Sequence, residues 1–166
     1  MKFSIGDLII YGETGVCRVE ATEERPFLGE ITNCYRLQPI YQSCVIYTPT
    51  DNGNVFMRPI VSAEDAQKLI DSFSTTEPMQ LPQGAPRVVS EIYDKIIKSH
   101  SCEELVTLIL SIRTKRKSLS DNKKKFSAID ERFLKKSEDL LFGEIAAALG
   151  IGKPDVSLMV NEKIGC

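Results

Sequence analysis

Hydrophobic residues change their spacing once along the chain, near Pro59. Before this point, short runs rich in β-branched and aromatic residues alternate with polar positions and are separated by turn-forming residues, a pattern typical of half-buried strands. The expected strands cover residues 8–11, 15–22, 32–40, 44–47 and 55–60. Several short strands at such close spacing predict a small, strongly bent sheet or a partly open barrel.

Beyond Pro59, apolar residues recur three and four positions apart, which predicts amphipathic helices that each bury one face. Three serines stand three residues before a carboxylate, the spacing of a capping box at a helix start. The pairs are Ser62 with Asp65, Ser101 with Glu104, and Ser127 with Asp130. We expect helices over residues 86–99, 101–115 and 127–149, with a further short one over 154–163, packed as a bundle.

These patterns predict an α+β protein with two parts. Residues 1–60 are expected to form the small β module, and residues 87–166 an all-α helical bundle domain. Between them, residues 61–86 are expected to form a connecting helix and a linker, because prolines and a glycine punctuate the stretch from Ser74 to Pro86.

Composition is that of a chain with an ordinary packed core: 42% of the 166 residues are hydrophobic and the net charge is −2. Residues 1–10 lack the features of a signal peptide and no apolar run approaches bilayer length, so we expect a cytoplasmic protein without a membrane partner. The five cysteines form no C-x-x-C pair, which favours reduced thiols and disfavours a metal site.

Motifs of catalysis are missing from the sequence. It contains no G-x-x-x-x-G-K-[ST] phosphate loop, no G-x-S-x-G nucleophile elbow and no H-E-x-x-H zinc helix. The one histidine, His100, lies between two expected helices with no nucleophile identifiable beside it. We therefore expect no enzyme and no cofactor, since a metal- or thiol-dependent enzyme would rest on the cysteines alone.

Basic residues gather between residues 113 and 125, where Asp121 is the one acid; they are Arg113, Lys115, Arg116, Lys117, Lys123, Lys124 and Lys125. Cations of this kind are common at helix C-termini, where the helix dipole favours them. The same cluster has the charge to contact the phosphate backbone of a duplex without reading bases. Local charge does not separate these two interpretations.

The stretch F-x-I-G-D-L-I-I-Y-G-E-T-G-V-x-x-V, with E-x-R and P-T-D-N after it, resembles the RNA-polymerase-interacting module of the CarD (CdnL) family of bacterial transcription regulators. The matching residues are Phe3, Gly6, Asp7, Tyr11, Gly15, Val19, Glu20, Arg25, Gly29, Pro49, Asp51 and Asn52. A similar module occurs in the transcription-repair coupling factor, beside helicase motifs that this chain lacks. More weakly, SAIDERFLKKSEDLLFGEIA is similar to the family's final long helix.

The resemblance implies a Tudor-like β module that docks on the polymerase β subunit by strand-to-strand contact. Arg25 falls on a family arginine that contacts polymerase, and Phe27 lies near it. The strand region from Tyr35 to Tyr47 is expected to share this surface, although Tyr47 stands where many members carry a second arginine.

For the helical domain, the resemblance implies contact with double-stranded promoter DNA near the upstream edge of the melted bubble, and stabilisation of the open complex. The family's wedge tryptophan would fall near residues 85–87, and this chain has no tryptophan. The residues expected to contact DNA are Arg87, Lys115, Arg116, Lys117, Lys123, Lys124, Lys125 and Arg132. We expect a regulator that binds polymerase as a monomer; the alternative is a polymerase-binding adaptor whose helical domain contacts protein and not DNA.

Overall fold

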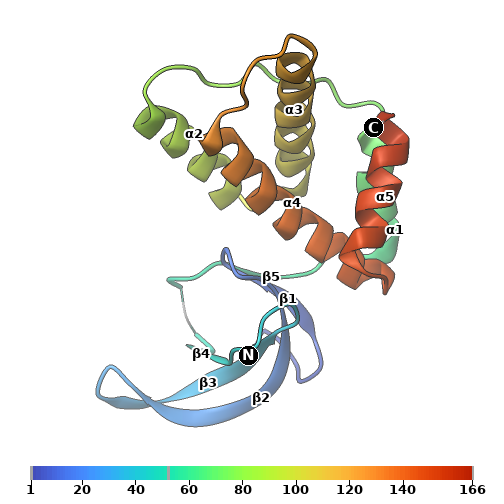
Figure 1. Cartoon of the computed structure of the whole chain (residues 1–166). Helices are drawn as coiled ribbons and strands as arrows, with labels where there is room; N and C mark the ends of the chain where they lie inside the picture. The colour runs from blue at the N-terminus through green and yellow to red at the C-terminus, as the bar shows by residue number, and fades with distance from the viewer. Residues whose placement is uncertain (1, 52, 166) are drawn as a thin grey trace. The chain divides into compact units, whose positions relative to one another are not determined.

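A computed structural model of the chain describes residues 2–51 and 53–165. Asn52, part of the resemblance, and Cys166 lie outside them. The chain divides into two compact units, Met1–Val61 and Ser62–Cys166 (Figure 1). Strands occupy the first unit and helices the second, which confirms the predicted α+β class. Among the described residues, none of the helices combines the length and apolar character needed to cross a bilayer.

The first unit is one antiparallel sheet. Its strands are β1 (Leu8–Tyr11), β2 (Gly15–Phe27), β3 (Glu30–Pro39), β4 (Ile46–Pro49) and β5 (Met57–Pro59), in the spatial order β4-β3-β2-β1-β5 (Figure 1). β2 continues to Phe27, beyond the predicted end at residue 22, because it pairs with β3 down to the Phe27–Glu30 pair. The strand order makes β4 and β5 the two edges of the sheet.

The core of the first unit is built from alternate positions of these strands. It contains Phe3, Ile9, Cys17, Val19, Tyr35 and Leu37. Tyr35 is fully buried, and its hydroxyl oxygen lies 3.0 Å from the backbone nitrogen of Lys2 and 3.2 Å from that of Phe3, accepting from both. The buried Tyr35 hydroxyl therefore provides a hydrogen-bond acceptor for two backbone N–H groups of the segment that precedes β1.

One irregularity interrupts the ladder between β2 and β3. Val19 pairs with Leu37 and Ala21 pairs with Arg36, so Glu20 is an extra residue on β2. Such a bulge changes the alternation of side chains along the strand that carries it. Val19 shares a face with buried Leu37, whereas after the bulge Thr22 pairs with buried Tyr35. The odd-numbered residues beyond Glu20 thus lie on the face away from Tyr35.

The second unit consists of α1 (Ala63–Ser72), α2 (Pro86–Lys98), α3 (Cys102–Asp121), α4 (Ala128–Leu149) and α5 (Lys153–Ile164). The three predicted serine caps are confirmed: Ser62, Ser101 and Ser127 each accept a hydrogen bond from the backbone three residues later. α3 was expected to end near residue 115, but it continues to Asp121. Lysine, arginine and leucine are good helix formers, so the helix extends beyond the last of its buried apolar residues.

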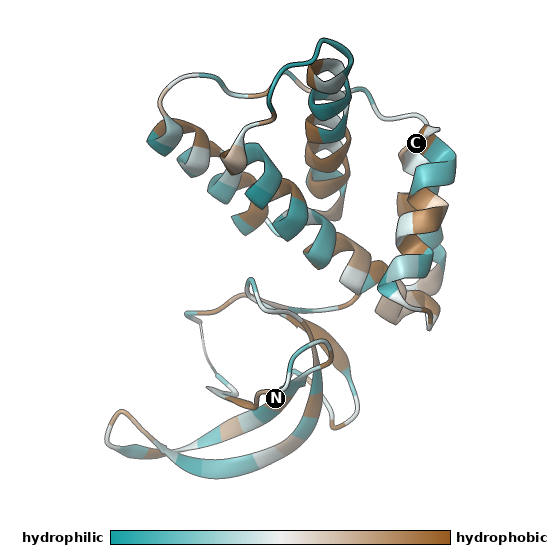
Figure 2. Cartoon of the chain, viewed as in Figure 1, coloured by the Kyte–Doolittle hydropathy of each residue, from teal (hydrophilic) through white to brown (hydrophobic). Residues whose placement is uncertain are grey.

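Buried residues of α3 and α4 form the centre of this unit, among them Leu108, Ile109, Ile112, Leu141 and Ile145. Hydrophobic and hydrophilic positions alternate around the helices, as expected for helices packed on one side (Figure 2). The segment between α1 and α2, which was expected to be a linker, lies against α3: the backbone nitrogen of Met79 donates to the Ser111 hydroxyl at 2.8 Å.

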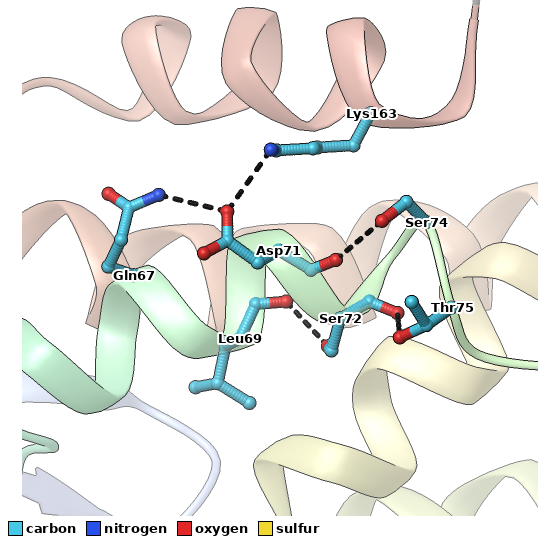
Figure 3. Close-up of polar contacts among 7 residues, drawn as sticks. All are labelled: Gln67, Leu69, Asp71, Ser72, Ser74, Thr75 and Lys163. Atoms are coloured by element: carbon cyan, nitrogen blue, oxygen red, sulfur yellow. Dashed lines mark hydrogen bonds and ion pairs between the residues drawn. The ribbon is translucent and has the colours of Figure 1, made fainter.

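α1 contacts α4 and α5 within the second unit. Near its C-terminal end, Asp71 accepts from Lys163 of α5 at 3.2 Å and from Gln67 at 3.2 Å (Figure 3). The hydroxyls of Ser72 and Ser74 donate to the nearby carbonyl oxygens of Leu69 and Asp71 (Figure 3). These side chains satisfy helix-end carbonyl groups that have no partner within the helix.

Candidate functional site

The outer face of the first unit brings together two residues that are distant in sequence. Arg25 on β2 and Tyr47 on β4 lie on either side of β3, and the Arg25 guanidinium stacks over the Tyr47 ring, 3.8 Å from its centroid. A guanidinium in this position is attracted to the aromatic face and still presents N–H donors at its edge. The structure therefore brings Arg25 and Tyr47, both predicted as docking residues, into one surface.

The strand register explains why the two side chains meet. Arg25 pairs with Thr32, and Tyr47 pairs with Arg36, so both point to the face away from buried Tyr35. Cys34 lies on that face of β3, between Thr32 and Arg36, and it is nonetheless buried. The Arg25–Tyr47 contact crosses β3 between Thr32 and Arg36, the stretch that contains Cys34.

The two remaining predicted docking residues have different environments. Phe27 lies two residues beyond Arg25 on the same face of β2 and is exposed. Tyr35, expected at the docking surface, is instead in the core, because its ring faces Phe3 and its hydroxyl serves the backbone before β1. Alternation along β3 puts Tyr35 on the covered face and its neighbour Arg36 on the outer one.

β4 adds a second feature to this surface. It pairs with β3 on one side only, so the backbone groups on its other side face no strand in the described part of the chain. A strand at the edge of a sheet is a template on which another protein's sheet can be extended. Tyr47 lies at the centre of this edge strand and is paired with Arg25.

In the second unit, two cations of the basic cluster are held internally. Lys115 of α3 donates to a carboxylate oxygen of Asp130 at 2.6 Å, and the Tyr93 hydroxyl donates to the other oxygen at 2.5 Å. Burial, together with the hydrogen bond to Asp130, raises the pKa of Tyr93, which keeps the phenol protonated as the donor. This network joins α2, α3 and α4, and it neutralises the charge of Lys115.

Arg113 makes a similar internal contact. Its guanidinium donates to Glu138 of α4 at 2.7 Å and to the side-chain oxygen of Asn161 on α5 at 2.6 Å. The same group lies 5.8 Å from the centroid of the Phe142 ring. Arg113 therefore connects three helices, and it is a structural residue despite its place in the basic cluster.

The other predicted DNA-contacting residues are exposed; they are Arg87, Arg116, Lys117, Lys123, Lys124, Lys125 and Arg132. Arg87 pairs with Glu91 one turn along α2 at 3.3 Å, and the Arg132 guanidinium stacks on Phe133 at 4.8 Å from its centroid. Arg116 and Lys117 are on the last turns of α3, and the three lysines follow the C-cap residue Asn122 in the loop to α4.

Backbone geometry orders the start of this lysine loop. The backbone nitrogen of Lys123 donates to Ser120 and that of Lys124 donates to Leu119 at 2.7 Å, with Lys123 at φ 55°. These two bonds form a Schellman motif, whose left-handed position is usually a glycine. Lys123 and Lys124 thus leave α3 in a defined turn, with their side chains exposed.

Sequence reasoning missed the partners of Lys115 and Arg113. Asp130 was identified only as a capping residue, which it also is, since its backbone nitrogen donates to Ser127. The available signal was weak: a buried carboxylate needs a partner, but nothing in the spacing says that the partner lies on another helix.

Thiols and possible metal ligands are the remaining reactive groups. Cys17, Cys34 and Cys102 are buried free thiols, and Cys44 is an exposed one. Burial raises the pKa of Cys17 to about 11, with a smaller contribution from Cys44, so this thiol stays protonated. Within residues 2–51 and 53–165, no group of three or more histidine, cysteine or acidic side chains is placed to hold a metal ion.

Comparison with known proteins assigns the first unit. Residues 3–61 match the family model described as the CarD-like/TRCF RID domain. This is an RNA-polymerase-interacting, non-catalytic domain, so the resemblance inferred from the N-terminal motifs is confirmed for the first unit. No curated protein matches the chain.

Proposed function

Because residues 3–61 form a CarD-like/TRCF RID domain, which supports interaction with RNA polymerase, we propose that the protein is a transcription regulator that docks on the polymerase β subunit. The first unit makes this contact through Arg25, Tyr47 and the edge strand β4. The helical unit contacts promoter DNA near the upstream edge of the bubble, and the two contacts together modulate the stability of the open complex.

The Arg25–Tyr47 pair is the observation that carries the docking surface. Stacking at 3.8 Å holds the guanidinium in one orientation before any partner arrives. Ordering a long side chain in advance lowers the entropy cost of binding, and an oriented guanidinium can meet a carboxylate through two parallel hydrogen bonds. Tyr47 thus acts by orienting Arg25, whereas the second arginine that many family members carry at this position would contact the partner itself.

Phosphate contact by the helical unit is supported by the exposed cations. With Lys115 held by Asp130, the cations that carry the proposal are Arg116, Lys117, Lys123, Lys124, Lys125 and Arg132. The lysine loop, residues 123–125, has no ion pair among the described residues. Such cations contact the DNA backbone without reading sequence, and their contribution to affinity falls as salt concentration rises.

Binding alone suffices for regulation in this proposal. A protein that holds polymerase and upstream DNA more tightly in the open complex than in the closed complex shifts the equilibrium by the ratio of the two affinities. The same differential contact lowers the rate at which the open complex closes. No catalytic group is required.

An adaptor whose helical unit contacts protein is the second candidate, and α2 favours it. Val88 is 48% exposed and Ile92 is 39% exposed, one turn apart on the helix that also carries Arg87. Arg87 itself is paired with Glu91, which lowers the net positive charge of this face. An apolar, charge-balanced helix face is better suited to a protein than to phosphates.

Docking is tested by capture of purified RNA polymerase on the tagged protein. Arg25→Glu should abolish most capture, because it removes the stacked cation and places a carboxylate over Tyr47. Arg18→Glu, on the same strand and also exposed, is the matched control and should capture polymerase like wild type. Equal capture by the wild type and Arg25→Glu would refute this docking surface.

DNA contact is tested by measuring promoter affinity at several salt concentrations in the presence of polymerase. Replacing Lys123, Lys124 and Lys125 by alanine should weaken binding and reduce the salt slope by about 0.9 for each phosphate that is no longer neutralised. The same three positions changed to arginine keep the charge and should retain the slope. If the alanine variant behaves as wild type while polymerase capture persists, the adaptor is the better description.

A further inference from the structure

The tip of the β2–β3 hairpin is strained and apolar at once. Phe27 pairs with Glu30, so Leu28 and Gly29 form a two-residue turn, with φ of 51° and 84°. Turns with two left-handed residues favour asparagine or aspartate followed by glycine, because other side chains are strained there. Leu28 occupies the strained first position and is 90% exposed to solvent.

Further apolar side chains surround Leu28. Ile31 is 68% exposed and Phe27 is 40% exposed, and the register puts them on opposite faces of the hairpin. Phe27 shares its face with Arg25, whereas Ile31 pairs with Pro26 on the other face. The tip thus carries an apolar side chain at its end and one on each face, with exposed Glu30 beside Phe27, an arrangement that suits an anchor entering a pocket end-on.

The hairpin reaches past the rest of its sheet. β1 pairs with β2 only as far as Arg18, and β4 pairs with β3 only as far as Cys34. Beyond these points β2 and β3 continue as a two-stranded ribbon (Figure 1). Leu28 is 90% exposed, so packing against the described residues of this unit does not explain a leucine at a strained turn, and strain of this kind points towards function.

We propose that Leu28, together with Phe27 and Ile31, is an apolar anchor that inserts into a hydrophobic pocket of RNA polymerase next to the Arg25–Tyr47 contact. This inference rests on the proposed docking function and extends it. The partner is taken to be polymerase because the tip adjoins the proposed docking surface. Arg25 and Phe27 are two residues apart on one face, so a partner lying over Arg25 reaches the tip.

Substitution of Leu28 by asparagine separates this role from a structural one. Asparagine suits the left-handed turn position, so Leu28→Asn should leave the fold intact and its unfolding midpoint equal to or above that of wild type. Polymerase affinity should fall tenfold or more, as expected when a buried leucine side chain is removed from an interface. A structural role predicts no such change in affinity.

Ile5→Asn is the matched control, because Ile5 is 69% exposed in a turn whose Gly6 donates to Val19. Val19 is roughly 25 Å along β2 from Phe27. This variant should bind polymerase like wild type. Affinities are measured by titrating each variant into labelled polymerase, with Arg25→Glu in parallel.

The two proposals fail in different ways. If Arg25→Glu weakens binding and Leu28→Asn does not, the anchor is refuted and the docking surface stands. If neither variant weakens binding, the docking surface is refuted together with the anchor. If Leu28→Asn lowers only the self-association of the protein, measured by ultracentrifugation, the tip contacts a second copy and the polymerase anchor is refuted.

Discussion

Lys115 and Lys124 belong to one basic cluster, yet the structure predicts opposite consequences for their removal. Lys115→Met should destabilise the helical unit without a specific effect on DNA binding. Lys124→Met should leave stability unchanged and weaken DNA binding. The difference follows from their partners: Lys115 lies 2.6 Å from buried Asp130, whereas Lys124 is exposed in the loop.

The cost of Lys115→Met can be worked from the geometry. Removing one partner of a fully buried ion pair costs about 3–5 kcal/mol, because the other charge is left buried. Asp130 is 2% exposed at its side chain, but Lys115 is 34% exposed, so water reaches one side of the pair. The Tyr93 hydroxyl also remains as a donor. About half the full cost, roughly 2 kcal/mol, is therefore expected.

Thermal and urea unfolding followed by circular dichroism at 222 nm would measure this change, because the helical unit dominates that signal. For a unit of this size, about 2 kcal/mol corresponds to a fall of about 10 °C in Tm. A double-mutant cycle with Asp130→Asn should recover a coupling energy of about 1 kcal/mol or more, since the two side chains are in contact.

A Lys115→Met variant that unfolds like wild type and weakens DNA binding as much as Lys124→Met does would contradict this assignment. That result would mean that the contact with Asp130 carries little energy and that Lys115 is available to phosphates. Lys124→Met serves as the matched control for loss of one positive charge from the same cluster.

Three further predictions concern other contacts. Tyr47→Ala should increase alkylation of Cys34 by iodoacetamide, read by mass spectrometry, because the Arg25–Tyr47 pair crosses the part of β3 that carries this buried thiol; unchanged labelling would show that the pair does not shield it. Lys123→Gly should raise the free energy of unfolding by up to about 1 kcal/mol in urea titrations, since glycine adopts the left-handed turn without strain; a loss of stability would argue against it. The hydrogen bonds from Lys163 and then Gln67 lower the pKa of Asp71. The stabilising contribution of Asp71 should therefore be complete above about pH 4 and be lost as the pH falls through the lowered pKa. Urea titrations of the wild type and Asp71→Asn across this range should differ above pH 4 and converge below it.

Local patterns predicted the elements well because their causes are local. A serine followed three residues later by a carboxylate satisfies helix N–H groups within a single turn, and all three such caps are present. Alternation predicted the strands for the same reason. It did not predict which face of β3 is covered, so it could not correct the placing of Tyr35 at the docking surface, which followed from the resemblance over the region from Tyr35 to Tyr47. Which face of β3 is buried depends on segments that are distant in sequence. Here the residues before β1 lie against the face that carries Tyr35.

Interactions between distant elements account for the rest. The density of basic residues in the sequence identified the basic cluster. The ion pairs of Lys115 with Asp130 and of Arg113 with Glu138 form only in the tertiary structure. The resemblance identified Arg25, while its stacking on Tyr47 depends on β3 lying between their strands. The turn residue Leu28 was not singled out, because a leucine in a sequence carries no sign that its backbone is left-handed.

The extra residue Glu20 on β2 has a consequence for how such domains should be compared across sequences. Val19 and Arg25 are six residues apart and would share a face of a regular strand, but the bulge puts Arg25 on the face away from Tyr35. If the bulge closed and every residue of β2 paired in turn, Arg25 would face the side occupied by Tyr35 without any change at position 25. Deletion of Glu20, by contrast, would leave Ala21 paired with Arg36 and Arg25 paired with Thr32 in a regular strand, and the arginine would keep its face. In an aligned sequence, a spacing one residue shorter between the positions of Val19 and Arg25 is therefore compatible with the same docking face.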